Sequence, residues 1–177
     1  EQEERIESEL KGLKAILGDI IYSEKDDTLE SAVGDLLKAY GKTLSTAESC
    51  TGGMISSLIT SVAGSSEYFL GSVTSYANGV KENVLGVPAE IIAEHGAVSS
   101  ECVAAMAEGV RRITSSDYSV ATSGIAGPGG GSEEKPVGTV WIGVSSDNGT
   151  ETFRLKFNSD RKRNIERFSA AALHFLL

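Results

Sequence analysis

Strand-like and helix-like segments alternate along the chain from Lys42 to its C-terminal end, which leaves few architectures open. A short strand is expected over 43–46, followed by apolar residues at helical spacing between Ile55 and Val62, and a second strand is expected over 71–77. This alternation is typical of a sheet covered by helices and not of a β-sandwich or a helical bundle. We therefore predict an α/β domain.

The remainder of this region ends in an antiparallel hairpin and a helix. A helix is expected from Ser99 or Ser100, and a buried strand is expected over 117–123. Two alternating runs, at 139–144 and 152–157, flank Asp147-Asn148-Gly149, and Asn-Gly is a strong hairpin signal because it tolerates positive φ. The last helix is expected over 161–176, with Ser159 or Asp160 as its cap.

The N-terminal part carries a different pattern. Apolar residues at helical spacing predict two helices within residues 1–40. We interpret residues 1–27 as an N-terminal helix or linker segment and residues 28–177 as the domain itself. The sequence starts at Glu1 and not at Met, so we expect a fragment or a processed product whose first helix leads to a further part.

Composition argues against several classes of function. The formal net charge is −9, from 25 acidic and 16 basic residues, so nucleic acid is not an expected partner. No apolar run has the roughly 20 residues needed to span a bilayer, and the N-terminus is acidic, so we expect a cytoplasmic protein that binds no membrane. The only cysteines and histidines are scattered, which favours neither disulfides nor a metal site: Cys50, Cys102, His95 and His174.

The segment from Ala47 to Gly53 lies where a strand passes into a helix. Backbone N–H groups and the positive end of the helix dipole converge on such a turn, which favours an anion or an oxyanion. Ser49 could project from this turn as a nucleophile, although the GxSxG pattern of a nucleophile elbow is absent. The alternative is that Ser49 or Thr51 only caps the helix.

A serine nucleophile needs a base, and neither histidine has an obvious local partner. Lys81 follows the expected second strand, and strand ends in layered α/β folds gather at one edge, where ligand crevices form. Its pKa would have to fall from about 10.4 before it could accept a proton. Two alternatives are that Lys81 is a solvated charge and that Cys50 and His95 form a Cys/His pair.

The loop from Gly124 to Ser132 is the third candidate feature. Its backbone amides could surround a phosphate, but the loop lacks GxxxxGK[ST], so the pattern excludes a P-loop. A glycine loop by itself is a weak signal of function.

Several longer motifs point to a known family. In chain order they closely resemble the C-terminal domain of the competence/damage-inducible protein CinA, a domain that also occurs alone as nicotinamide-nucleotide amidohydrolase. The resemblance covers roughly residues 28–177, and several motifs in register are more specific than any one glycine loop. The motifs are TAESCTGG (46–53), TSYAN (74–78) with Lys81 beyond it, EHGAVS (94–99) and SGIAGPGGGSEEKPVGTVW (123–141).

The resemblance implies a fold and an activity. The fold would be a three-layer α/β/α arrangement with a mixed, mostly parallel sheet of about five strands, one of them antiparallel. The activity would be hydrolysis of nicotinamide mononucleotide to nicotinic acid mononucleotide and ammonia, in pyridine-nucleotide salvage, without metal or cofactor. The family's serine falls on Ser49 and its lysine on Lys81, with Tyr76 beside them to orient the proton or to relay it.

The remaining site residues are expected to hold the substrate. Backbone amides around Cys50 to Gly52 would bind the oxyanion, and the glycine loop with Arg161 would bind ribose and phosphate. Glu48 would orient Lys81 or contact the substrate, or would be a surface or supporting carboxylate. The expected binding residues are Glu48, Cys50, Thr51, Gly52, Asn78, Ser123, Gly124, Gly127 and Arg161.

The resemblance leaves one alternative function and two expectations about partners. The alternative is a nucleotide-sensing module that keeps the pocket without useful turnover and serves a partner domain or the competence machinery. We expect a homodimer, which is usual in families of this kind. Longer members carry an N-terminal molybdopterin-binding-like domain, and residues 17–22 resemble the segment that joins the two domains.

Overall fold

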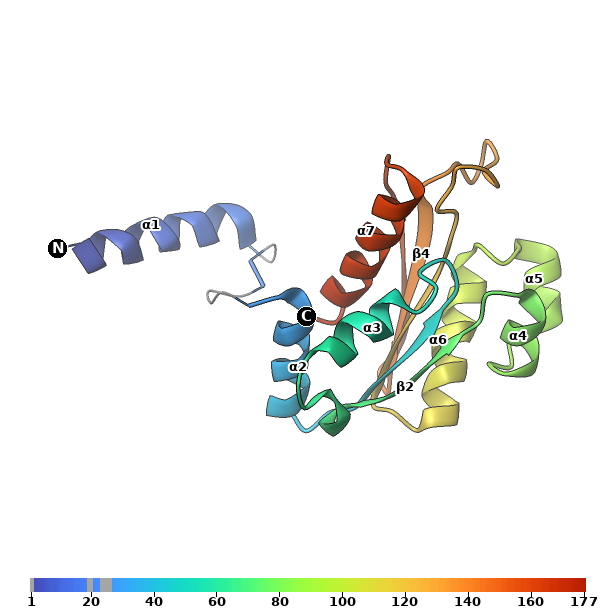
Figure 1. Ribbon diagram of the computed structural model, residues 1–177, viewed down its shortest axis with the longest axis horizontal. Helices are drawn as coiled ribbons and strands as arrows, with labels where there is room; N and C mark the ends of the chain where they lie inside the picture. The colour runs from blue at the N-terminus through green and yellow to red at the C-terminus, as the bar shows by residue number, and fades with distance from the viewer. Residues whose placement is uncertain (1, 19–20, 23–26) are drawn as a thin grey trace.

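A computed structural model describes residues 2–18, 21–22 and 27–177 (Figure 1). The two expected N-terminal helices are α1 (Gln2–Leu17) and α2 (Leu29–Ala39), and Thr28 caps α2 by accepting a hydrogen bond from the N–H of Ser31. Residues 1, 19–20 and 23–26, which include parts of the expected N-terminal segment 1–27 and of the joining segment 17–22, lie outside the described residues. In Figure 1, α1 lies apart from the rest of the molecule.

A five-stranded mixed sheet forms the centre of the fold, in the order β2-β1-β3-β4-β5. The strand β1 lies parallel to both β2 and β3, whereas β4 is antiparallel to both β3 and β5. Four strands therefore point in one direction and β4 alone is reversed, as the sequence predicted. The strands are β1 (Leu44–Glu48), β2 (Phe69–Thr74), β3 (Tyr118–Gly124), β4 (Thr139–Ser146) and β5 (Gly149–Lys156).

Helices cover both faces of this sheet, which confirms the three-layer α/β/α arrangement (Figure 1). On one face, α2, α3 (Met54–Ser61) and α7 (Arg161–His174) pack through buried apolar residues such as Val33, Ile55 and Phe168. On the other face, α6 (Ser100–Thr114) contributes Val103, Met106 and other residues to a second apolar cluster. Each face thus has its own core.

Short elements complete the second face and the connections. The helices α4 (Asn78–Asn83) and α5 (Ala89–His95) follow β2, and a 3₁₀ turn, η2 (Ser65–Glu67), precedes it. The side chains of Ser99 and Asp160 cap α6 and α7. Each is one of the two cap residues that the sequence suggested for its helix. None of the helices in the described part of the chain has the length and apolar character to cross a membrane.

Strand boundaries differ from the prediction because neighbouring strands define them. The second strand was expected over 71–77 but ends at Thr74, which pairs with Glu48, the last residue of β1. The N–H of Ser75 makes a last bond to the Glu48 carbonyl at 2.8 Å, and residues 76–77 then turn toward α4. This turn brings the lysine of α4 to the carboxyl edge of the sheet.

Candidate active site

The end of β1 sends adjacent side chains to opposite faces of the sheet. Successive residues of a strand alternate in direction, and Ala47 belongs to the apolar cluster beside α6. Ser49 continues this register, since its N–H donates to the carbonyl of Thr122 at 3.0 Å. Glu48 therefore faces α3, whereas Ser49 faces the layer that contains α4.

Lys81 on α4 meets Ser49 on that face. Its Nζ lies 3.1 Å from Ser49 Oγ and 2.6 Å from the carbonyl oxygen of Ser75, with the Tyr76 carbonyl at 3.4 Å. Lys81 is 1% exposed, whereas Ser49 is half-buried and accessible at the edge. The structure thus brings together the nucleophile and base suggested by the sequence, and Lys81 is not a solvated surface charge.

The surroundings of Lys81 favour its neutral form. Burial lowers the pKa of the ammonium below its ordinary value of 10.5 because water no longer solvates the charge. The nearest polar groups are two carbonyls and a hydroxyl, not a carboxylate. A neutral amine there can donate its two hydrogens to the carbonyls and turn its lone pair toward Ser49.

Two backbone donors in the turn after Ser49 have no acceptor in another residue. Six of the eight N–H groups from residue 49 to residue 56 donate to other protein groups. They belong to Ser49, Gly52, Gly53, Met54, Ile55 and Ser56. Within this described turn, only the N–H groups of Cys50 and Thr51 have no acceptor in another residue. Buried N–H groups are rarely left unpaired, so these two are available to an oxyanion.

Glu48 caps α3 and does not orient Lys81. Its carboxylate is fully buried and accepts from the N–H groups of Gly53, Ile55 and Ser56 at 2.8–3.0 Å. The suggested surface carboxylate is therefore wrong, and alternation along β1 explains why Glu48 points away from Lys81. Because Glu48 supplies this cap, neither Ser49 nor Thr51 does so.

The side chain of Thr51 also faces the protein. Thr51 is 3% exposed, and its hydroxyl lies 2.8 Å from the hydroxyl of Thr122 on β3. Thr51 can therefore contact a substrate through its backbone N–H but not through its side chain. Gly52, beside it, is exposed with φ +63° and open space where a Cβ would be, so it can face a ligand.

Tyr76 and Arg161 form a pair at the mouth of the site. The Tyr76 side chain is 63% exposed, and its hydroxyl accepts a hydrogen bond from Arg161 Nη2 at 3.1 Å. The hydroxyl thus engages α7 and not Lys81, which argues against a proton relay; Tyr76 orients the lysine through its carbonyl. Arg161 also donates to the carbonyl of Gly127 at 2.7 Å, which links Tyr76 to the glycine loop.

The predicted binding residues at the start of the glycine loop pack inside the protein. Gly124 ends β3, and a Cβ there would lie 2.6 Å from the carbonyl oxygen of Thr139, so this glycine serves strand packing and does not open a ligand cradle. Ser123 is buried and donates to the carbonyl of Ala97 at 2.6 Å. Gly127, at φ +93°, is buried: a Cβ there would lie 2.6 Å from Val137, and its carbonyl accepts from Arg161. Asn78 is exposed at the start of α4.

The alternative Cys/His pair is not formed. Cys50 is 7% exposed, and burial raises the pKa of its thiol to about 12, which disfavours the nucleophilic thiolate. His95 lies at the end of α5, 3.7 Å from Glu94 and 3.8 Å from Glu101. Within the described residues, no cluster of histidine, cysteine and carboxylate side chains suits a metal ion.

Sequence reasoning missed two residues that shape the site. Ser75 supplies the closest carbonyl to Lys81, and Thr122 contacts the turn that carries Ser49. Ser75 could have been found by asking which carbonyls a short helix brings near its own lysine. Thr122 had no local signal, because its role depends on the pairing of β1 with β3.

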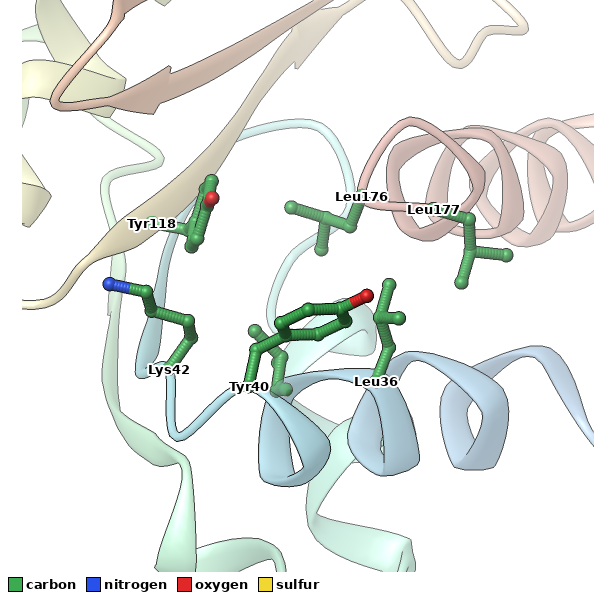
Figure 2. A pocket seen from close by; sticks show the side chains of 7 residues that line it. Leu36, Tyr40, Lys42, Tyr118, Leu176 and Leu177 are labelled. Atoms are coloured by element: carbon green, nitrogen blue, oxygen red, sulfur yellow. The ribbon is translucent and has the colours of Figure 1, made fainter.

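A pocket of about 290 Å³ lies at the opposite edge of the sheet (Figure 2). Leu36, Leu176 and Leu177 give it a largely apolar lining, and Lys42 in its wall pairs with Asp117 at 3.1 Å. Ligands of open α/β sheets bind at the carboxyl ends of the strands, whereas Lys42 and Tyr118 precede β1 and start β3. We therefore locate the candidate site at Ser49 and not at this pocket.

Comparison with known proteins agrees with this architecture. The family model described as the CinA C-terminal domain matches residues 26–177. A CinA-like protein of Cytophaga hutchinsonii is 47% identical over 156 residues, which cover 88% of this chain and 37% of that protein. A CinA-like protein of Salinibacter ruber is 46% identical over 169 residues, covering 96% and 41% respectively.

A solved structure is similar in three dimensions as well. The competence/damage inducible protein CihA from Agrobacterium tumefaciens matches with a TM-score of 0.81 at 36% sequence identity, covering 84% of this chain and 91% of that chain. Against the two curated relatives the coverage is uneven, since the chain spans about two fifths of their length.

Proposed function

The chain belongs to the CinA C-terminal domain family, and from that premise we propose that it hydrolyses the carboxamide of nicotinamide mononucleotide. The products are nicotinic acid mononucleotide and ammonia. The observation that carries the proposal is the 3.1 Å contact between Ser49 Oγ and the buried Nζ of Lys81. A serine activated by a desolvated lysine is a known way to attack an unactivated acyl group.

Acylation uses Lys81 first as a base and then as an acid. Ser49 Oγ attacks the carboxamide carbon while its proton passes to the lone pair of Lys81 Nζ. The tetrahedral intermediate carries the negative charge on the former carbonyl oxygen. Lys81 then donates its proton to the amide nitrogen, the C–N bond breaks, and ammonia leaves an ester on Ser49.

Deacylation repeats the same steps with water. A water molecule gives its proton to Lys81 as it attacks the ester carbon, and Lys81 returns a proton to Ser49 Oγ as the C–O bond breaks. The carboxylate product leaves with the nucleotide, and the free serine is restored. The pathway consumes one water and requires no cofactor.

The N–H groups of Cys50 and Thr51, which bond to no other residue, are suited to hold the oxyanion in both steps. Ser49's own N–H bonds to Thr122 and that of Gly52 bonds to Ser49, so neither is available. A donor from the residue after the nucleophile is a recurring arrangement at strand-to-helix turns. Loss of one such donor typically costs about 10²–10³-fold in kcat.

Exposed groups at the mouth support a nucleotide as the substrate. Arg161 provides a cation, and the exposed glycines at positions 129–131 offer backbone amides that can approach a phosphate closely. The exposed Tyr76 ring lies beside them through its bond to Arg161. We assign the phosphate and ribose to this side and the carboxamide to Ser49.

The test is product formation from nicotinamide mononucleotide by the purified protein. We expect ammonia and nicotinic acid mononucleotide in equal amounts, measured by a coupled ammonia assay and by chromatography. The Ser49→Ala variant, purified in parallel, controls for contaminating amidases and should bind the nucleotide without turnover. Binding by the wild type with no ammonia above this control would contradict the proposal and favour a nucleotide-sensing module.

A further inference from the structure

We propose that Thr122 is a positioning residue that aims the backbone N–H groups of Cys50 and Thr51 at the reacting carbonyl. The inference rests on the proposed serine chemistry and adds a residue that does not touch the substrate. Thr122 is fully buried in β3, on the strand beside the nucleophile, and belongs to neither the Ser49–Lys81 pair nor the glycine loop.

Thr122 contacts each of the three residues of the nucleophile turn. Its carbonyl accepts the N–H of Ser49 at 3.0 Å. Its hydroxyl lies 2.8 Å from the hydroxyl of Thr51. It also lies near enough to the Cys50 thiol to offset part of the rise that burial causes in the pKa of that thiol. Thr122 thus holds Ser49 through its carbonyl and Thr51 through its hydroxyl, on either side of Cys50.

The rest of the turn is held independently. Glu48 binds the N–H groups at the start of α3, so it fixes the far end of the turn at Gly53. Gly52, between the two clamps, has φ +63° and open space around it, so it places no steric limit on the preceding peptides. The hydroxyl pair of Thr51 and Thr122 is therefore the side-chain contact that fixes the peptide planes next to Ser49.

The first experiment separates positioning from stability. Thr122→Val removes one hydroxyl and leaves Thr51 Oγ1 buried without a partner, so both Tm and kcat should fall. The double variant Thr51→Val/Thr122→Val replaces both partners with isosteric apolar groups, which can be nearly neutral for folding. We expect its Tm to recover toward the wild type while kcat stays about 10–100-fold low, with KM changed far less.

Two further variants serve as controls. Thr122→Ser keeps the hydroxyl and should restore most of kcat. Ser119→Ala, on the same strand, removes a buried hydroxyl that donates to the Ala107 carbonyl at 2.7 Å, away from the turn. It should lower Tm without lowering kcat. If kcat recovers together with Tm in the double variant, Thr122 is only structural and the proposal is overturned.

A second readout does not depend on the natural substrate. Acetylation of Ser49 by p-nitrophenyl acetate, followed by peptide mass spectrometry, needs the same oxyanion donors but no nucleotide. We expect the double variant to be acetylated about 10–100-fold more slowly than the wild type and Thr122→Ser to react nearly as the wild type does. This pattern without ammonia release from the nucleotide would reject the proposed function alone. Equal acetylation rates in wild type and double variant, or no acetylation of wild-type Ser49, would overturn the role of Thr122.

Discussion

The turn over residues 48–56 and the loop over residues 124–138 both lie at the carboxyl edge of the sheet, but they are held differently. Short, buried contacts fix the turn: the Glu48 carboxylate on three N–H groups and the Thr51–Thr122 hydroxyl pair. The loop has a buried side-chain contact at its start, from the Asn164 amide to the Ala126 carbonyl. Beyond it, long cationic side chains hold the loop, as Arg161 and Arg154 donate to the carbonyls of Gly127 and Glu134. Residues 128–134 of this loop are exposed.

This difference separates two tasks. Attack on an amide requires a nucleophile, a base and oxyanion donors held to within a fraction of an ångström, which a strand-anchored turn can provide. Binding of a nucleotide tolerates adjustment, because flexible cations and glycine amides can follow the ligand. We therefore expect substitutions in the turn to reduce kcat and substitutions around the loop to raise KM.

Replacing Lys81 should cause the largest loss of kcat. If Lys81 is the base, Lys81→Ala and Lys81→Arg should both lose about 10²–10⁴-fold in kcat, because arginine keeps the charge but does not deprotonate in the useful range. Steady-state ammonia release measures the loss. Substantial rescue by arginine would instead mean that Lys81 acts only by stabilising negative charge.

The pH dependence tests the same residue without a substitution. The pKa of Lys81 is lowered in the folded protein, so kcat/KM should rise with pH through that lowered value, as the amine loses its proton. The free energy of unfolding should also rise with pH. Between the folded pKa and the ordinary value of 10.5 the unfolded chain binds more protons, so unfolding free energy rises with pH. Lys81→Met should lack that rise. Denaturant titrations at several pH values measure the free energy of unfolding, and the same dependence on pH in this variant and the wild type would contradict the prediction.

Replacing Arg161 should weaken binding of the nucleotide and therefore raise KM. Arg161→Ala removes the cation at the mouth and its bonds to Tyr76 and Gly127, so we expect KM to rise about 10–100-fold with a smaller change in kcat. Arg163→Ala is the matched control, since Arg163 is an exposed arginine on the same turn that faces Asp160 at 3.8 Å. Equal effects of the two variants would show that Arg161 has no specific role.

Asp117, at the far edge of the sheet, should affect neither task. Hydrogen bonds from Thr43 and Lys42 lower the pKa of its carboxyl from the ordinary value of 3.8 to about 2. The ionised carboxylate therefore contributes fully to stability above pH 3.8, and this contribution disappears as the pH falls through about 2. Asp117→Asn should lower Tm at neutral pH by about 2–4 °C and weaken the acid dependence. Thermal scans between pH 2 and 7 measure this, and a loss of kcat at neutral pH would show that the two edges are coupled.

The sequence predicted the parts of the site that depend on local order. The strand-turn-helix pattern made Ser49 a candidate and the position of Lys81 after the second strand made it a candidate base. The family motifs then favoured both over a helix cap and a solvated charge. The hairpin at Asn148-Gly149 and the cap at Asp160 also followed from local chemistry. For the hairpin and the cap, residues within a few positions of one another determine the outcome.

One error was local, and the others arose where residues distant in sequence decide the geometry. Glu48 was assigned to the site although alternation along β1 directs it to α3, and this could have been deduced once the strand was extended to residue 48. The Tyr76 hydroxyl was assigned to the proton path, but it meets Arg161, 85 positions later. Thr122 was missed because its contacts with the turn need the β1–β3 register.

The central claim is that Ser49, activated by Lys81, forms an acyl-enzyme with the nucleotide. Hydroxylamine added to the reaction can intercept such an ester whichever step limits the rate. We predict that nicotinamide mononucleotide then yields the hydroxamate of the nicotinate nucleotide together with ammonia, and that neither product forms with Ser49→Ala. Continued ammonia release at saturating hydroxylamine with no hydroxamate would contradict the account, because water would then attack the carboxamide directly.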